Sequence, residues 1–322
     1  MVRNTIKFLF PLCLPFLFLT SCDLTGKNRK KPASTGQPYE IVLEGDTDSI
    51  VTRILTEDVP ALPQPEPLCK LIQVKKGKTK GSYLLVRTRI IVNITDKDFA
   101  VKLNHDENAA PQNIIRINAR SVQQLQERLN GEKLRQLVDE AELEHLAEMI
   151  SNNPSKQNKE MQEEVKKTFG LDMKIPVSMN ASKKAKDFIW ISNNASTGMQ
   201  NLLVMKVKSE ERRMKNSNAF HVNVNDKAQI DSILRTNMPG ETDNMYMVIP
   251  VLSDRGLWEM KGDAMGGPYV MHRIHRQQNQ AAKQNQTAKP GYSLYIIGFV
   301  YAPEMKKKIL IKQLEAAIST IK

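Results

Sequence analysis

Tyr292-Ser-Leu-Tyr-Ile-Ile-Gly-Phe-Val-Tyr301 is a run of aromatic and aliphatic residues, and Ala302 and Pro303 follow it directly. Such a run is typical of a β-strand. Proline is favoured in the first turn of a helix, so Pro303 indicates where the next element begins. Apolar residues then recur at helical spacing, at Ile309, Leu310, Leu314, Ala317, Ile318 and Ile321. A strand followed at once by an amphipathic helix predicts a fold that mixes both kinds of element.

The same two patterns recur throughout the chain before this stretch. Strand-like runs, bounded by Gly, Asn, Asp or Lys turns, occupy residues 39–43, 68–74, 83–94, 99–103, 113–118, 188–192, 202–207, 270–275 and the surroundings of Trp258. Helical spacing occupies residues 48–56, 121–149, 155–169 and 226–236. The fold class that we expect is α+β, with antiparallel sheets and packed helices. The four runs between residues 68 and 118 should form one such antiparallel set.

Two lobes are the organisation that we expect after the amino-terminal region. Residues 39–170 hold the first strands and a long helical segment, and residues 171–322 hold the second set of strands. A short motif recurs between them, because Ile54-Leu55-x-x-x-Val59-Pro60 is echoed by Ile233-Leu234-x-x-x-Met238-Pro239. This repetition raises the hypothesis that the lobes form an internal pseudo-repeat.

The amino terminus has the pattern of an export signal. Arg3 and Lys7 precede an uncharged stretch from Phe8 to Leu19, which runs into Thr20-Ser-Cys22. That stretch is shorter than the ~20 apolar residues of a transmembrane helix. Its ending resembles the lipobox of bacterial lipoproteins, in which the cysteine is acylated and becomes the first mature residue. We expect a lipoprotein signal peptide over residues 1–22, with Cys22 lipidated; the alternative is an ordinary signal peptide with an incidental cysteine.

Residues 23–38 contain no large apolar side chain except Leu24 and are rich in Lys, Gly, Pro, Ser and Thr. This composition predicts a flexible basic tether between the anchor and the folded body. The membrane, reached through the lipid on Cys22, is therefore the first partner that we expect. The chain should lie at a periplasm-facing surface of the bacterial cell envelope.

Composition and charge narrow the class of further partners. The chain has 322 residues with 40% hydrophobic content, enough for a folded core, and a formal net charge of +12. A basic surface suits an anionic envelope polymer or an envelope protein, whereas export makes nucleic acid a poor partner. Once Cys13 leaves with the signal and Cys22 carries lipid, only Cys69 is left. We therefore expect no intramolecular disulfide and a buried Cys69.

Four segments together resemble a known family. They are Gly36-Gln-Pro-Tyr-Glu-Ile-Val-Leu-Glu-Gly-Asp46, Phe188-Ile-Trp-Ile-Ser-Asn-Asn194, Arg255-Gly-Leu-Trp-Glu-Met-Lys-Gly-Asp-Ala-Met-Gly-Gly-Pro-Tyr269 and Gly298-Phe-Val-Tyr-Ala-Pro303. On these segments the chain resembles an uncharacterised family of exported lipoproteins from Bacteroidetes-type bacteria, which is classed as a domain of unknown function. The resemblance implies an envelope lipoprotein and brings no activity with it.

Candidate site residues are few. The histidines lack the spacing of a metal site, so we expect no metal and no cofactor. Trp258, Asp263, Gly266, Gly267 and Tyr269 lie close together in sequence, and they are the residues that we consider for an exposed groove that binds a glycan or peptide. The alternative is a tight turn with Trp258 in the core, where the glycines permit the backbone geometry.

A catalytic role finds little support in the sequence. The chain contains no Gly-x-Ser-x-Gly elbow of the kind that positions a nucleophilic serine. We therefore expect a non-catalytic binding or structural component of the envelope. The alternative is an envelope hydrolase, which would require His272 and Asp263 to converge in a cleft beside the Gly266-Gly267 loop.

Overall fold

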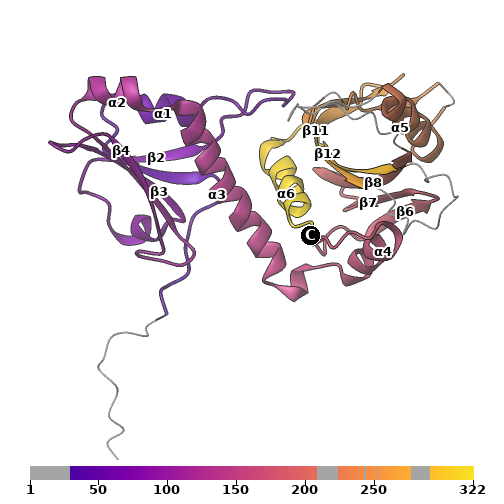
Figure 1. Cartoon of the computed structure of the whole chain (residues 1–322), viewed down its shortest axis with the longest axis horizontal. Helices are drawn as coiled ribbons and strands as arrows, with labels where there is room; N and C mark the ends of the chain where they lie inside the picture. The colour runs from indigo at the N-terminus through magenta and orange to yellow at the C-terminus, as the bar shows by residue number, and fades with distance from the viewer. Residues whose placement is uncertain (1–29, 209–223, 243, 252, 277–290) are drawn as a thin grey trace, which may run out of the picture. The chain divides into compact units, whose positions relative to one another are not determined.

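A computed structural model of this chain describes residues 30–208, 224–242, 244–251, 253–276 and 291–322. Within them, the strands form one sheet of five strands and one of seven, and α-helices pack against both (Figure 1). The expected α+β class is therefore confirmed. None of the helices in these ranges is long and apolar enough to cross a membrane.

The first sheet has helices packed against one of its faces. In the strand order β2-β1-β3-β5-β4, its strands are β1 (Glu40–Glu44), β2 (Lys70–Val74), β3 (Thr88–Ile94), β4 (Ala100–His105) and β5 (Asn113–Ala119). The helices are α1 (Ile50–Leu55), α2 (Val122–Arg128) and α3 (Gly131–Ser151). Alternate strand residues such as Ile90 and Ile115 form a core with Val51 of α1 and Val138 of α3. The period of two along the strands places these side chains on the face that the helices cover.

Most pairings in this sheet are parallel, which corrects the expected antiparallel set. β1 pairs in parallel with β2 and with β3, and β3 pairs in parallel with β5. β4 runs antiparallel to β5 at one edge. The reason is the connection: α1 carries the chain back from the end of β1 to the start of β2, so the two strands run in the same direction. Residues 83–85, expected to begin a strand, belong instead to the short 3-10 turn η1 (Gly81–Leu85).

Short polar side chains begin α2 and α3. Ser121 Oγ accepts a hydrogen bond from the Gln124 backbone N–H at 3.1 Å. Asn130 Oδ1 accepts one from the Lys133 N–H at 2.9 Å. Two caps this close together divide the helical segment that we expected over residues 121–149 into two helices.

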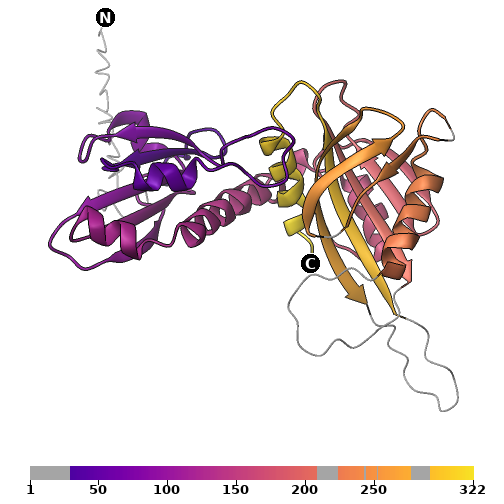
Figure 2. The ribbon, with the colours of Figure 1, turned by 90° about the horizontal axis from the view of Figure 1, so that it is seen from above.

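The second sheet is antiparallel throughout and curled (Figure 2). In the strand order β6-β7-β8-β12-β11-β10-β9, its strands are β6 (Ala181–Ala185), β7 (Phe188–Ser192), β8 (Met199–Lys208), β9 (Tyr246–Val248), β10 (Arg255–Lys261), β11 (Gly266–Arg276) and β12 (Tyr292–Tyr301). The helices beside it are α4 (Lys159–Phe169), α5 (Val224–Asn237) and α6 (Lys308–Ser319).

Strand β12 of the second sheet is buried on both faces. Leu294, Ile296 and Val300 pack in one core with residues of α4 and α6. Tyr295, Ile297 and Phe299 pack in another core with residues of α5. A Cβ on Gly298 would lie 2.9 Å from the Leu314 Cβ, so glycine at this position allows α6 to approach the strand.

Two of the expected boundaries change. α4 packs in the core of the second sheet through Met161, Val165 and Phe169, so it belongs with the second lobe and not with residues 39–170. The expected tether over residues 23–38 also ends earlier, because Ala33 and Thr35 form β-bridges to the body. The reason in both cases is a tertiary contact, an apolar helix stripe in one and backbone hydrogen bonds in the other.

The two lobes have different topologies, so the pseudo-repeat hypothesis is wrong. α1 joins two parallel neighbours, β1 and β2. α5 lies between β8 and β9 in a sheet whose pairings are all antiparallel, and these two strands are not neighbours. The shared Ile-Leu motif reflects the apolar stripe that each helix turns to its own core.

α6 belongs to two cores at once. Leu314 and Ile318 pack with the second sheet, while Ala316 and Ile309 pack with the core of the first. Figure 1 shows α6, in yellow, beside α3. The carboxy-terminal helix therefore joins the two lobes.

Candidate functional site

The aromatic residues of the predicted groove are buried. Trp258 and Tyr269 are 3% and 1% exposed, and both belong to the core that faces α5. The Trp258 Nε1–H donates a hydrogen bond to the Val300 carbonyl at 3.0 Å. Neither ring is available to stack on a ligand at the surface, which corrects the groove hypothesis for these two residues.

The backbone explains the other three residues of the predicted groove: Gly266 and Gly267 allow neighbouring strands to approach closely, and Asp263 binds a backbone N–H in its turn. A Cβ on Gly267 would lie 2.1 Å from the Val300 carbonyl oxygen, and one on Gly266 would lie 2.9 Å from the Trp258 carbonyl oxygen. Asp263 is exposed in the β10–β11 turn, where its carboxylate accepts a hydrogen bond from the Ala264 N–H at 2.6 Å. The alternative of a tight turn with Trp258 in the core describes this segment.

His272 and Asp263 lie apart, which corrects the hydrolase hypothesis built on them. Gly266 pairs with Glu259 next to the turn that holds Asp263, whereas His272 pairs with Ile296 six positions further along β11. At ~3.4 Å per residue, that separation is about 20 Å. A base and its partner in such a site must lie within hydrogen-bond reach.

The remaining expectations concern cysteine and metal. Cys69 is buried, and burial raises its thiol pKa to about 12, so the side chain behaves as a small apolar group. The part of the chain that the structure describes holds no cluster of three or more His, Cys, Asp or Glu side chains suited to a metal ion. Cys22 lies outside the described residues.

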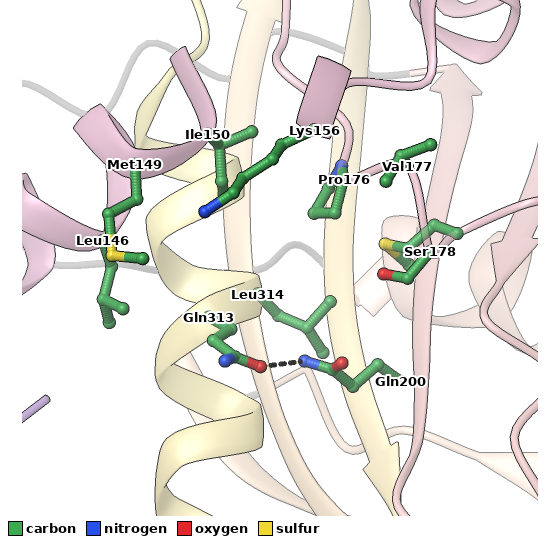
Figure 3. Close-up of a pocket in the computed structure, with 11 residues that line it drawn as sticks. Leu146, Met149, Ile150, Lys156, Pro176, Val177, Ser178, Gln200, Gln313 and Leu314 are labelled. Atoms are coloured by element: carbon green, nitrogen blue, oxygen red, sulfur yellow. Dashed lines mark hydrogen bonds between the residues drawn. The ribbon is translucent and has the colours of Figure 1, made fainter. Parts of the chain in front are cut away.

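A pocket of about 230 Å³ opens where α3, α6 and the start of the second lobe meet (Figure 3). We call it the junction pocket. Seven of its eleven lining residues are apolar: Leu146, Met149, Ile150, Pro176, Val177, Met179 and Leu314. The other four are Lys156, Ser178, Gln200 and Gln313. Met149 and Val177 are 41% and 51% exposed, so apolar surface continues from the pocket to the outside.

Local hydrogen bonds hold the walls of the junction pocket in place. Gln157 Nε2 donates to the Ile150 and Ser151 carbonyls at 2.9 Å each, which closes the end of α3. The Val177 N–H donates to the Lys156 carbonyl at 2.8 Å, so the loop before β6 stays against η2 (Pro154–Lys156). The pocket is therefore built from fixed backbone.

Two polar features face the junction pocket. Gln200 Nε2 donates to the Leu310 carbonyl at 2.9 Å and to Gln313 Oε1 at 3.0 Å, and this bond joins β8 to α6 (Figure 3). Lys156 is exposed, and its side chain runs back towards Ile150 at the pocket (Figure 3). It is the only charged residue among the eleven that line the pocket.

A second pocket, of about 610 Å³, lies between β11 and the end of α6. Arg255 and Glu315 line it and pair with each other at 2.6 Å. His272 also lines it, and burial lowers the pKa of its imidazole. Asp254 and Ser319 line it as well, and within the described residues no hydrogen bond joins either of them to His272.

Polar residues outside the junction pocket tie α3 to α6 and to the first sheet. Asp139 accepts hydrogen bonds from the Tyr39 hydroxyl at 2.7 Å and from Lys312 Nζ at 2.7 Å. Burial and the Asp139 carboxylate raise the pKa of Tyr39 far above its usual range, so the hydroxyl stays a donor. Glu142 accepts from the Tyr39 N–H at 2.8 Å and from Thr88 Oγ1 at 2.6 Å. These bonds fix α3 over the strands that begin the first lobe.

The sequence predicted helices over residues 121–149 and through Leu314, but it did not bring Leu146, Met149 and Leu314 together. Lys156, Gln200 and Gln313 carried no signal, because polar residues in a loop, a strand and a helix are individually ordinary. Only the packing of α3 against α6 makes them neighbours.

Comparison with known proteins assigns both halves of the chain to domains without a known role. A family described as Domain of unknown function (DUF4837) matches residues 158–320, just over half of the chain. A second, described as Domain of unknown function (DUF8532), matches residues 34–151. No curated protein and no solved structure matches the chain. The two matched segments meet between residues 151 and 158, and α4 falls in the second, in agreement with its packing.

Proposed function

Because this chain belongs to the family described as Domain of unknown function (DUF4837), which brings no activity with it, we propose a role from its own residues. The chain is a lipid-anchored protein of the bacterial cell envelope, and its folded body binds a ligand without catalysing a reaction.

The sequence of the amino terminus supports the anchor. The short apolar stretch that ends at Cys22 is typical of an exported lipoprotein, and its resemblance to exported lipoproteins of Bacteroidetes-type bacteria points the same way. Acyl chains on Cys22, palmitate among them, would hold the body at a periplasm-facing leaflet, because each buried methylene contributes ~0.8 kcal/mol.

The junction pocket is the observation that carries the binding role. It is a concave, mostly apolar surface, and the Lys156 ammonium at its edge has no partner among the residues that the structure describes. Such pockets are the usual form of a ligand site. Its walls come from both matched segments, since Leu146 lies in the first and Gln200 in the second. A ligand there would contact both lobes.

The anchor is tested by metabolic labelling with a palmitate analogue, followed by membrane fractionation. The wild type should label and sediment with membranes, whereas Cys22→Ala should lose both properties. Cys13→Ala is the matched control, because this cysteine would leave with the signal peptide, and it should behave like the wild type. Retention and labelling of Cys22→Ala at wild-type levels would overturn the lipoprotein assignment.

A further inference from the structure

The lining of the junction pocket also defines a class of ligand, on the premise of the binding role proposed above. We infer that the pocket takes one unbranched alkyl chain that ends in a carboxylate, the chemistry of a medium-chain fatty acid. Three observations lead to this class: the apolar lining, the single positive charge and the volume.

The apolar lining suits a flexible hydrocarbon chain. Met149 and Met179 contribute unbranched thioethers, which adapt to irregular apolar shapes. Leu146 of α3 and Leu314 of α6 line the pocket with them. Burial of an alkyl chain against these side chains is favourable in proportion to the apolar area that it removes from water.

The charge of the pocket selects an anionic end group. Lys156 is the only charged lining residue, and its side-chain ammonium has no ion pair or hydrogen bond within the described part of the chain. A carboxylate at the end of an alkyl chain would give this ammonium its partner. The exposure of Lys156 places that pair at the mouth, where the ligand head keeps contact with water.

The volume and the amide pair limit what else fits. At about 230 Å³ the junction pocket is smaller than the ~300–1,000 Å³ of sites for drug-sized ligands, which disfavours a sugar chain or a two-chain lipid. Both Gln200 amide hydrogens are already used, on Leu310 and Gln313, so this side chain adds no donor for a peptide carbonyl. One narrow chain with one charge is what the pocket accommodates.

The test is a titration of the mature chain from residue 22, made without acylation, with decanoate and with decan-1-ol. Carbon-13 methionine methyl groups report on the site directly. The Met149 and Met179 methyl signals should shift, and the Met247 methyl, buried in the core that faces α5, should not. Decanoate should bind about two- to fivefold more tightly than the alcohol at low salt, which is the size of an exposed ion pair.

Variants separate the charge from the pocket. Lys156→Gln should remove the preference for decanoate and leave decan-1-ol binding unchanged. Lys186→Gln, an exposed lysine in the β6–β7 turn, is the matched control and should keep the preference. Val177→Glu places a negative charge at the mouth of the pocket, which repels the carboxylate of decanoate. It should therefore weaken the binding of decanoate more than that of decan-1-ol.

Each contrary outcome has a distinct meaning. The inference that the ligand ends in a carboxylate is overturned if the wild type binds decanoate and decan-1-ol equally, or if Lys156→Gln keeps the preference. The binding role of the pocket would remain. Tighter binding of N-acetyl-Ala-Leu than of decanoate replaces the fatty acid by a peptide carboxy terminus. If none of the three probes shifts the Met149 and Met179 methyls, the binding role of the junction pocket fails as well, whereas the Cys22 labelling result stands apart.

Discussion

Lys312 Nζ on α6 lies 2.7 Å from Asp139 Oδ2 on α3, and the lysine side chain is 1% exposed. A second carboxylate, Glu315 Oε2, lies 3.0 Å from the same ammonium. A buried charge is tolerated when it is paired, and removal of one partner leaves the remaining charges uncompensated. Because α3 and α6 belong to segments matched by different families, this pair holds two domains together.

Lys312→Met should lower the free energy of unfolding by about 3 kcal/mol, because it leaves Asp139 and Glu315 without their shared cation. Urea denaturation measures the change. Lys306→Met is the control, since Lys306 is exposed just before the same helix, and it should stay within about 0.5 kcal/mol of the wild type. In the double variant with Asp139→Asn, the two losses should not add. Additive losses would show that the pair is not coupled.

Glu66→Gln should destabilise the docking of α6 onto the first lobe. The Glu66 carboxylate accepts hydrogen bonds from the backbone N–H groups of Lys307 at 2.6 Å and Lys308 at 3.2 Å, so it caps this helix from another part of the chain. A charged cap of this kind contributes about 1–2 kcal/mol. Calorimetry should show a lower Tm for Glu66→Gln and an unchanged one for the exposed Glu304→Gln. Equal Tm values for the two variants would argue against the cap.

Gly267→Ala should be more damaging than Gly298→Ala. A Cβ at position 267 meets the Val300 backbone oxygen at 2.1 Å, and backbone cannot move aside, whereas one at position 298 meets the Leu314 side chain at 2.9 Å. Gly298→Ala should cost about 1–3 kcal/mol through displacement of α6. Soluble yield and urea midpoints rank the variants. A Gly267→Ala variant as stable as the wild type would contradict the steric role assigned to this glycine.

His145 should make the protein less stable in mild acid. Burial, and then the neighbouring Arg87, lower its pKa from 6.5 to about 4 in the folded state. Between these values the unfolded chain binds a proton that the folded chain does not, so stability is complete above pH 6.5 and falls as the pH approaches 4. His145→Gln should flatten urea midpoints over that window. His105→Gln, exposed on β4, is the control, and an equal flattening there would assign the slope to something other than His145.

Local features were predictable from sequence where neighbouring residues decide them. The Ser121 cap and the end of the polar helix at Gly170 are of this kind, because the partner atoms lie within a few residues and Gly170 adopts φ +68° without strain. The strand over β12 and the helix α6 follow for the same reason, since alternation and helical spacing are properties of a continuous segment.

The direction of the strands and the position of the candidate site could not be predicted from neighbouring residues. Alternation along β1 and β2 is the same whether they run parallel or antiparallel, so only the path through α1 decides between them. Trp258 and Tyr269 resemble a binding surface in sequence, and only the curled sheet shows that they are core.

The α+β class, most helix and strand positions and the expectation of a lipidated Cys22 follow from the sequence, because each depends on a short stretch of chain. The parallel first sheet, the junction pocket and the Lys312–Asp139 pair between the two domains depend on tertiary contacts. Lys312 and Asp139 are 173 positions apart, and Leu146 meets Gln200 and Leu314 only where three elements pack. Contacts of that kind depend on how whole faces are buried against one another, and no local pattern of residues records that choice.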